Sequence, residues 1–260
     1  MTNANPFAER STLEYELPPF ADIKEEHYLS AFYEGCRQQL AEVQAILNTP
    51  GAPTFANTIV ELEKSGQMLM RMLLVFYNKS SSDTSDALDA IKEEMAPKLA
   101  AHQDAINLNP TLFKRIKDLY EAREAIGLNS EDAWLLERYY KDLIHAGAHL
   151  SDAQRDRLKE LNEELSKLET QFGKNVLADT NELAVLVDRI EELAGLSENE
   201  IASAAIAATD RGHEGKWLIG MVNFTGNPVL DSLTNRELRR QIMETSMLKA
   251  NRANEHDNKP

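Results

Sequence analysis

The sequence holds a single cysteine, Cys36, among its 260 residues. One thiol cannot make an intrachain disulfide, and so low a cysteine count suits a reducing compartment. Cys36 shares an apolar helical stripe with Leu29, Phe32 and Leu40. That position favours a small buried core residue over a reactive nucleophile.

Long apolar runs are also missing, since no run approaches the roughly 18 residues that indicate a transmembrane helix. The N-terminus has neither the basic stretch nor the apolar core of a secretory signal. We therefore expect no membrane partner and a cytoplasmic location.

Basic residues are few. Lys and Arg number 28 against 43 Asp and Glu, which gives a formal net charge of −15. The acidic residues are spread as short pairs rather than gathered in blocks. Because phosphate binding needs clustered Lys and Arg, this balance argues against nucleic acid and against an anionic membrane surface. It is typical of a solvated, soluble exterior.

Apolar residues at helical spacing dominate the chain. After an extended arm over residues 1–22, they predict helices over 24–48, 54–78, 83–106, 110–127, 130–147, 151–178, from 197 onward, and over 234–253. Gly66 lies on the buried stripe of the second helix, where a close approach by a neighbouring helix could offset its poor helix propensity. The fold class that follows is mainly α, a bundle of long antiparallel helices.

Two segments, 182–188 and 216–224, break the helical pattern. Both are short, β-branched and bounded by turn residues, so they predict a small two-stranded β-element near residues 182–224. We see no linker long enough to separate two domains and expect one helical region over 1–260: helical hairpins over 24–149, the long helix, then the β-element and terminal helices over 180–253. Residues 251–260 are polar and follow directly on a helix. We interpret them as a chain cut short of its natural end.

The longest predicted helix, over residues 151–178, carries an apolar seam close to heptad spacing. The seam consists of Leu158, Leu161, Leu165, Leu168, Phe172 and Val176. Four heptads are barely reached, so the seam predicts packing inside a bundle rather than a free coiled coil.

The stretch LIHAGAHL places His145 and His149 four residues apart, the spacing of two metal ligands on one helix face. The peptidase signature H-E-x-x-H needs a glutamate as general base, and Ala146 stands in its place. Gly147 also weakens the helix that would hold the ligands, and no third ligand is evident at useful spacing. We expect two histidines near the C-terminal end of a structural helix. We also expect His102 to have a structural role, as a hydrogen-bonded core residue.

Other catalytic signatures are missing as well. There is no G-x-S-x-G, no P-loop and no G-x-G-x-x-G. Paired carboxylates such as Glu93 and Glu94 are adjacent in sequence, so on a helix they diverge by about 100° and make poor acid–base partners. We therefore predict no catalytic residue, no cofactor-binding residue and no metal ligand within residues 1–260.

Several stretches, taken in order, resemble one enzyme family. They are STLEYELPPFADIKEEHYLSAFYEG (11–35), TFANTIVELEKSG (54–66), the run over 146–187, and KWLIGMVNFTGNPVLDSLTNRELRR (216–240). Together they look like the N-terminal region of the bacterial peptidyl-dipeptidases, or dipeptidyl carboxypeptidases, of the thimet-oligopeptidase family of zinc metallopeptidases. No single stretch is as specific as a metal motif, but the ordered set covers essentially the whole chain.

The resemblance implies a large, mostly helical enzyme whose two halves surround a deep channel. Its zinc-binding H-E-x-x-H helix and its third ligand lie downstream of the part matched here, so no catalytic or metal role carries over to a residue of this sequence. The implied reaction of the full-length enzyme is release of C-terminal dipeptides from short peptides, with zinc as cofactor. This chain would be one channel wall, inactive alone and partnered by the missing catalytic part.

Two alternatives stay open. The chain could be a stand-alone helical module that binds a peptide or protein partner without catalysis. A weaker alternative is a zinc-binding protein that uses His145 and His149. The reading frame beyond codon 260 separates the enzyme from the module, and metal analysis tests the zinc protein.

Overall fold

The computed structural model of the chain describes residues 5–259, except that the side chains of residues 223–225 and 227 are not described. The chain divides into two compact units, Met1–Lys167 and Leu168–Pro260. Their boundary falls inside one continuous helix, α7 (Asp152–Glu182). No linker separates the units, and the predicted single region over 1–260 stays a prediction.

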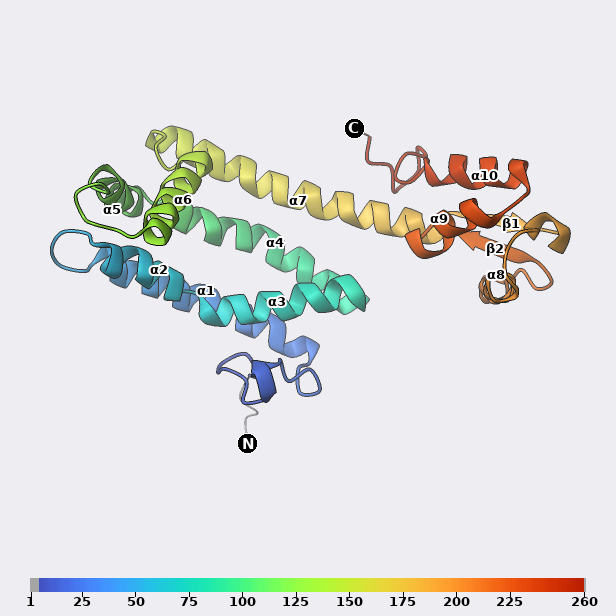
Figure 1. Cartoon of the computed structure of the whole chain (residues 1–260), viewed down its shortest axis with the longest axis horizontal. Helices are drawn as coiled ribbons and strands as arrows, with labels where there is room; N and C mark the ends of the chain where they lie inside the picture. Colours follow the sequence, from blue (N-terminus) through green and yellow to red (C-terminus); the bar gives the residue numbers. More distant parts are fainter. Residues whose placement is uncertain (1–4, 260) are drawn as a thin grey trace. The chain divides into compact units, whose positions relative to one another are not determined.

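Helices make up the first unit (Figure 1). They are α1 (Glu25–Leu47), a π-helical segment (Ala56–Val60), α2 (Glu61–Lys64), α3 (Gln67–Ser82), α4 (Asp86–Asn107), α5 (Pro110–Glu121), α6 (Ser130–Ala146) and the first half of α7. A short 3-10 turn, Glu14–Glu16, precedes them in the N-terminal arm. α3 runs back along α1, and α4 packs against α1. One core fills the space between them, with Phe32, Met72 and Phe76 almost fully buried.

The predicted helix over 54–78 is interrupted at Gly66. Ser65 is extended and Gly66 is left-handed with φ 72°, so α2 ends at Lys64 and α3 begins at Gln67. The atoms nearest to a Cβ added on Gly66 belong to the side-chain amide of Gln39 in α1, whose nitrogen would lie 2.4 Å away, so a side chain and not the backbone of the neighbouring helix approaches the glycine. The glycine therefore serves the break in the helix, where its left-handed φ suits a residue without a Cβ.

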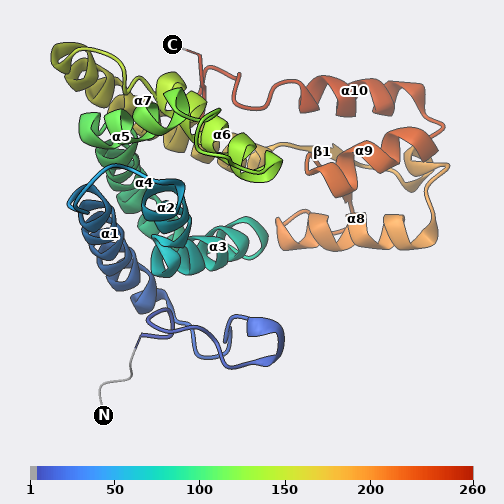
Figure 2. The same ribbon diagram turned by 60° about the vertical axis from the view of Figure 1, so that its left-hand side comes forward.

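The second unit combines the end of α7 with a small sheet and further helices. In chain order they are β1 (Ala184–Val187), a 3-10 turn (Ile190–Leu193), α8 (Glu198–Asp210), β2 (Trp217–Gly220), α9 (Asn223–Ser232) and α10 (Arg236–Ser246). The strands pair antiparallel, with Ala184 opposite Gly220 and Val187 opposite Trp217. Figure 2 shows α8 and α10 on opposite sides of β1 and α9. The predicted mainly-α class with a two-stranded β-element is confirmed.

Two boundaries in this unit differ from the prediction. The second strand stops at Gly220, and residues that we expected to extend it begin α9 instead. The last helix ends at Ser246 rather than near 253, and the chain beyond it turns and reaches left-handed φ values at Ala250 and Ala253. Residues 251–258 are thus a folded segment and not a plain extension of the helix.

The seam of α7 differs from its prediction in burial. Four of its members, Leu161, Leu165, Leu168 and Phe172, are between 44% and 60% exposed. Heptad spacing shows that a helix can pack against another helix, but it does not place the partner within the same chain. The predicted burial inside a bundle is therefore wrong for these four side chains.

Within residues 5–259, no helix is both long enough and apolar enough to cross a membrane.

Candidate functional site

The two histidines with metal-ligand spacing do not lie on one helix. α6 ends before Gly147, which adopts a φ of 96°. The backbone N–H groups of Gly147 and Ala148 donate back to carbonyls in the last turn of α6, at 3.0 and 2.9 Å, and close the helix in a Schellman motif. His145 sits in that last turn and His149 in the turn beyond it, and both are exposed. The one-face geometry of a metal-binding helix therefore does not apply to this pair.

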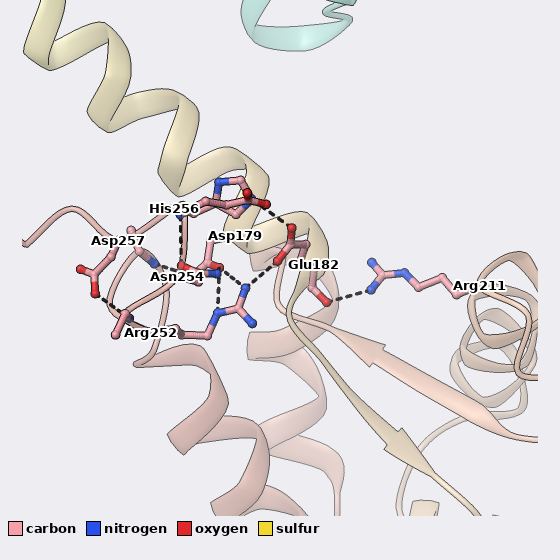
Figure 3. Close-up of polar contacts among 10 residues, drawn as sticks. Asp179, Glu182, Arg211, Arg252, Asn254, His256 and Asp257 are labelled. Carbon is pink, nitrogen blue, oxygen red and sulfur yellow. Dashed lines mark hydrogen bonds and ion pairs between the residues drawn. The ribbon is translucent and has the colours of Figure 1, made fainter.

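The last turns of α7 carry the carboxylate of Asp179 (Figure 3). This side chain is fully buried, with an exposed fraction of 0%. Its Oδ2 accepts a bond from the N–H of Ala250 at 2.6 Å, and its Oδ1 accepts one from Nε of Arg252 at 2.8 Å. A second Arg252 nitrogen and the Asn254 amide also donate to Oδ1. The hydrogen bonds from Arg252 hold the pKa of the Asp179 carboxyl below its ordinary value, although burial opposes them. The carboxylate is therefore ionised, and both of its oxygens accept hydrogen bonds.

These donors belong to one segment, residues 250–258, which we call the strap. It lies along the C-terminal half of α7, and its far end is also bonded there. Nδ2 of Asn175 donates to Oδ1 of Asn258 at 2.8 Å, and Nδ2 of Asn258 donates to the carbonyl of Phe172 at 3.2 Å. Left-handed φ values at non-glycine residues cost of the order of 1 kcal/mol each. The strap has two such residues, Ala250 and Ala253, and its hydrogen bonds to α7 offset their cost.

One group of possible metal ligands joins the end of α7 to the strap. Oxygens of Glu182 and Glu255 and a ring nitrogen of His256 all lie within 4.8 Å of one another. Both Glu182 oxygens are engaged, one with Arg252 at 2.7 Å and one with His256 at 3.0 Å. A cation here would face the Arg252 guanidinium and would have to displace it from Glu182. The group fits a latch between α7 and the strap and does not fit a zinc site.

A cavity of about 290 Å³ lies in the first unit, between α1, α3 and α4, with Tyr139 of α6 on its wall. His102 lines it and is buried, with its Nε2 2.7 Å from Oε1 of Gln39, so the expected hydrogen-bonded core histidine is confirmed. The hydroxyl of Ser65 donates to the Leu62 carbonyl at 2.8 Å instead of to His102. The cavity therefore does not pair that hydroxyl with an imidazole base.

A second cavity, about 400 Å³, lies in the second unit between α8, β2 and α9. Its floor is apolar, with Leu218, Ile219 and Met221 from the strand region. On its rim, Arg211 donates to the carbonyls of Asn181 at 2.5 Å and Glu182 at 3.2 Å (Figure 3). Arg211 is thus occupied in closing the C-terminal end of α7.

Cys36 agrees with its prediction as a packing residue. It is partly buried against the core of the first unit, and burial raises the pKa of its thiol to about 11. A thiol with that pKa is protonated near neutrality and is a poor nucleophile.

Asp179 and its strap were not predicted from the sequence. One signal was available: Asn175 and Asp179 follow Phe172 at steps of three and four, so two polar residues continue the apolar face of α7. Polar side chains on such a face indicate buried partners. The partners themselves, more than 70 positions away in the chain, had no local signature.

No protein-family model matches the chain. Individual proteins do. It is 38% identical over 257 residues to the dipeptidyl carboxypeptidase of Escherichia coli (strain K12), and 37% identical over 255 residues to that of Salmonella typhimurium. These matches cover 99% and 98% of this chain, which spans only 38% of the length of either relative.

The similarity extends at lower identity to a second peptidase. Oligopeptidase A of E. coli is 28% identical over 232 residues, which are 88% of this chain and 33% of that protein. The resemblance found in the sequence is therefore confirmed: nearly the whole chain matches the dipeptidyl carboxypeptidases, and at greater distance the oligopeptidases A.

Proposed function

We propose that this chain forms part of a peptidase that releases C-terminal dipeptides from short peptides. The observation that carries the proposal is the 38% identity to a dipeptidyl carboxypeptidase over 99% of the chain. Because the chain spans 38% of that relative, the activity belongs in this proposal to a longer protein. The same proposal includes a cytoplasmic location and short peptides as substrates.

The role proposed for residues 1–260 is structural. They form a wall of the substrate channel, which includes the long helices α4 and α7. These helices act as a rigid screen that admits unfolded peptides and excludes folded proteins. Zinc would supply Lewis-acid activation of a water molecule. Since the latch of Glu182, Glu255 and His256 does not fit that metal, we assign the zinc ligands and the catalytic base to the additional length that the relatives have.

The test compares purified residues 1–260 with the product of the complete reading frame, on a short N-blocked peptide whose released dipeptide is quantified. We expect dipeptide release by the longer product only, and loss of that release with a zinc chelator. Release by residues 1–260 alone would contradict the structural role. If the product of the complete reading frame binds short peptides without cleaving them, the result would favour the stand-alone binding module instead.

A further inference from the structure

One face of α7 carries an apolar stripe that is open to solvent. Its members, Leu161, Leu165, Leu168 and Phe172, are 44%, 52%, 60% and 58% exposed. We call these four residues the α7 stripe. At 1.5 Å per residue it runs for about 17 Å along one side of the helix. Scattered apolar residues on a surface need no explanation, but a continuous row on one helix face indicates a binding partner.

The spacing within the α7 stripe indicates what kind of element covers it. The steps are four, three and four residues, the a and d positions of a heptad pattern. Side chains at these positions insert between those of a second helix. The face also continues into a contact already made, because the strap lies on Asn175 and Asp179 and bonds the carbonyl of Phe172. A helix is therefore the fitting cover for the part of the face that the strap leaves open.

Two glutamates border the α7 stripe. At about 100° per residue, Glu164 lies roughly 70° to one side of its centre and Glu169 roughly 70° to the other. Both are exposed, and neither makes an ion pair with any residue of the described range 5–259. At one end Arg157 also flanks the stripe, but Glu160 neutralises it at 2.7 Å. The borders are therefore net acidic.

These borders disfavour a second copy of the chain as the cover. In a parallel pair, Glu164 of one helix would face Glu169 of the other, because the border positions g and e meet. In an antiparallel pair like positions meet, so Glu164 would face Glu164 and Glu169 would face Glu169. Either arrangement puts like charges together beside an apolar seam. A helix bordered by lysine or arginine satisfies both glutamates.

We propose that the α7 stripe is the docking site of an amphipathic helix whose apolar residues are bordered by lysine or arginine. The helix comes from the remaining part of the longer peptidase, so its source rests on the proposed function. The charge borders then fix the choice and the register of the helix, while the four apolar side chains supply most of the affinity.

The chemistry is tested on residues 1–260 with two designed peptides of about 21 residues, which have leucine at a and d and either lysine or glutamate at e and g. Fluorescence anisotropy should show binding of the lysine peptide and at least about tenfold weaker binding of the glutamate peptide. The double substitution Leu165→Asn and Leu168→Asn should abolish binding. Leu74→Asn, at a 65% exposed position of α3, is the control and should change nothing.

A charge exchange makes the test sharper. Glu164→Lys with Glu169→Lys should reverse the preference toward the glutamate peptide, and helix propensity is nearly unchanged because Lys and Glu are similar helix formers. Glu9→Lys with Glu14→Lys alters the net charge equally but lies in the N-terminal arm, and should keep the original preference. Equal binding of both peptides, or self-association that the leucine changes abolish, would overturn the proposal.

The source is tested in the product of the complete reading frame, with a photo-crosslinking amino acid in place of Leu165. We expect a crosslink within one polypeptide, to a helix outside residues 1–260 that has basic borders. A crosslink between two copies, or only to another protein, overturns the source. If the crosslink within one polypeptide forms but the product releases no dipeptide, the docking site stands and the proposed function fails. The failures of the two proposals are therefore distinguishable.

Discussion

At the scale of single residues, the polar groups that matter most in the second unit are those of the Asp179 cluster. A fully buried carboxylate is costly unless charge and hydrogen bonds compensate it. Here Arg252 supplies the charge, and the backbone of Ala250 supplies a hydrogen bond. Because both donors lie on the strap, the same contacts that satisfy Asp179 hold residues 250–258 against α7.

We predict that Asp179→Asn destabilises the second unit by about 2–4 kcal/mol, because it leaves Arg252 without its buried counter-charge. Urea unfolding followed by circular dichroism measures the change. The control is Asp83→Asn, which removes an exposed ion pair with Lys79 and should have no measurable effect. Equal stability of Asp179→Asn and the native chain would contradict the assigned role of Asp179.

His102 gives a prediction for pH dependence. Burial lowers its pKa below the ordinary value near 6.5, so the unfolded chain takes up a proton at higher pH than the folded chain. Its contribution to stability is therefore complete above about pH 6.5 and is lost as the pH falls toward the folded pKa. The free energy of unfolding of the native chain should fall between about pH 7.5 and about pH 5, and the substitution His102→Gln should make this fall smaller. His213→Gln, at an exposed position, is the control, and an unchanged slope in His102→Gln would contradict the prediction.

At the scale of elements, helical periodicity was sufficient to place most helices, because each buries one apolar face. It could not show the interruption at Gly66, since a left-handed residue between two helical stretches leaves the apolar spacing intact. It also missed α9, which contains Pro228 and follows directly on β2. The exposure of the α7 stripe depends on distant residues that no local pattern encodes. The positions of Asn175 and Asp179 on the apolar face of α7 signal buried partners but do not identify them.

Two glycines in helices allow a matched test of how closely α1 and α3 approach. A Cβ added to Gly35 of α1 would lie 2.9 Å from backbone atoms of Leu69 in α3, whereas one added to Gly173 of α7 would meet nothing within 4 Å. Gly35→Ala should therefore cost about 1–3 kcal/mol because the helices must separate. Gly173→Ala should stabilise by about 0.5–1 kcal/mol through helix propensity. Thermal unfolding measures both, and stabilisation by Gly35→Ala would show that the contact is looser than described.

At the scale of the whole molecule, the chain carries two separate sets of core residues. The first unit buries its apolar residues in clusters around Phe32 and Ile116, and the second around Leu193 and Leu233. α7 belongs to both units, but its stripe is exposed and adds little to either core. Most of the stabilising burial is therefore internal to each unit.

This distribution predicts that the two units lose structure separately. Native-state hydrogen exchange should show that Asp179→Asn lowers protection in β1, β2 and α8 while α1 and α3 keep theirs, and that Gly35→Ala does the reverse. The reason is that the described partners of Asp179 lie in the second unit, whereas the atoms nearest to a Cβ on Gly35 belong to Leu69 of α3. The comparison controls itself, because each variant serves as the reference for the other. If either substitution lowers protection equally in both units, then the chain unfolds as one cooperative body and α7 couples its two cores.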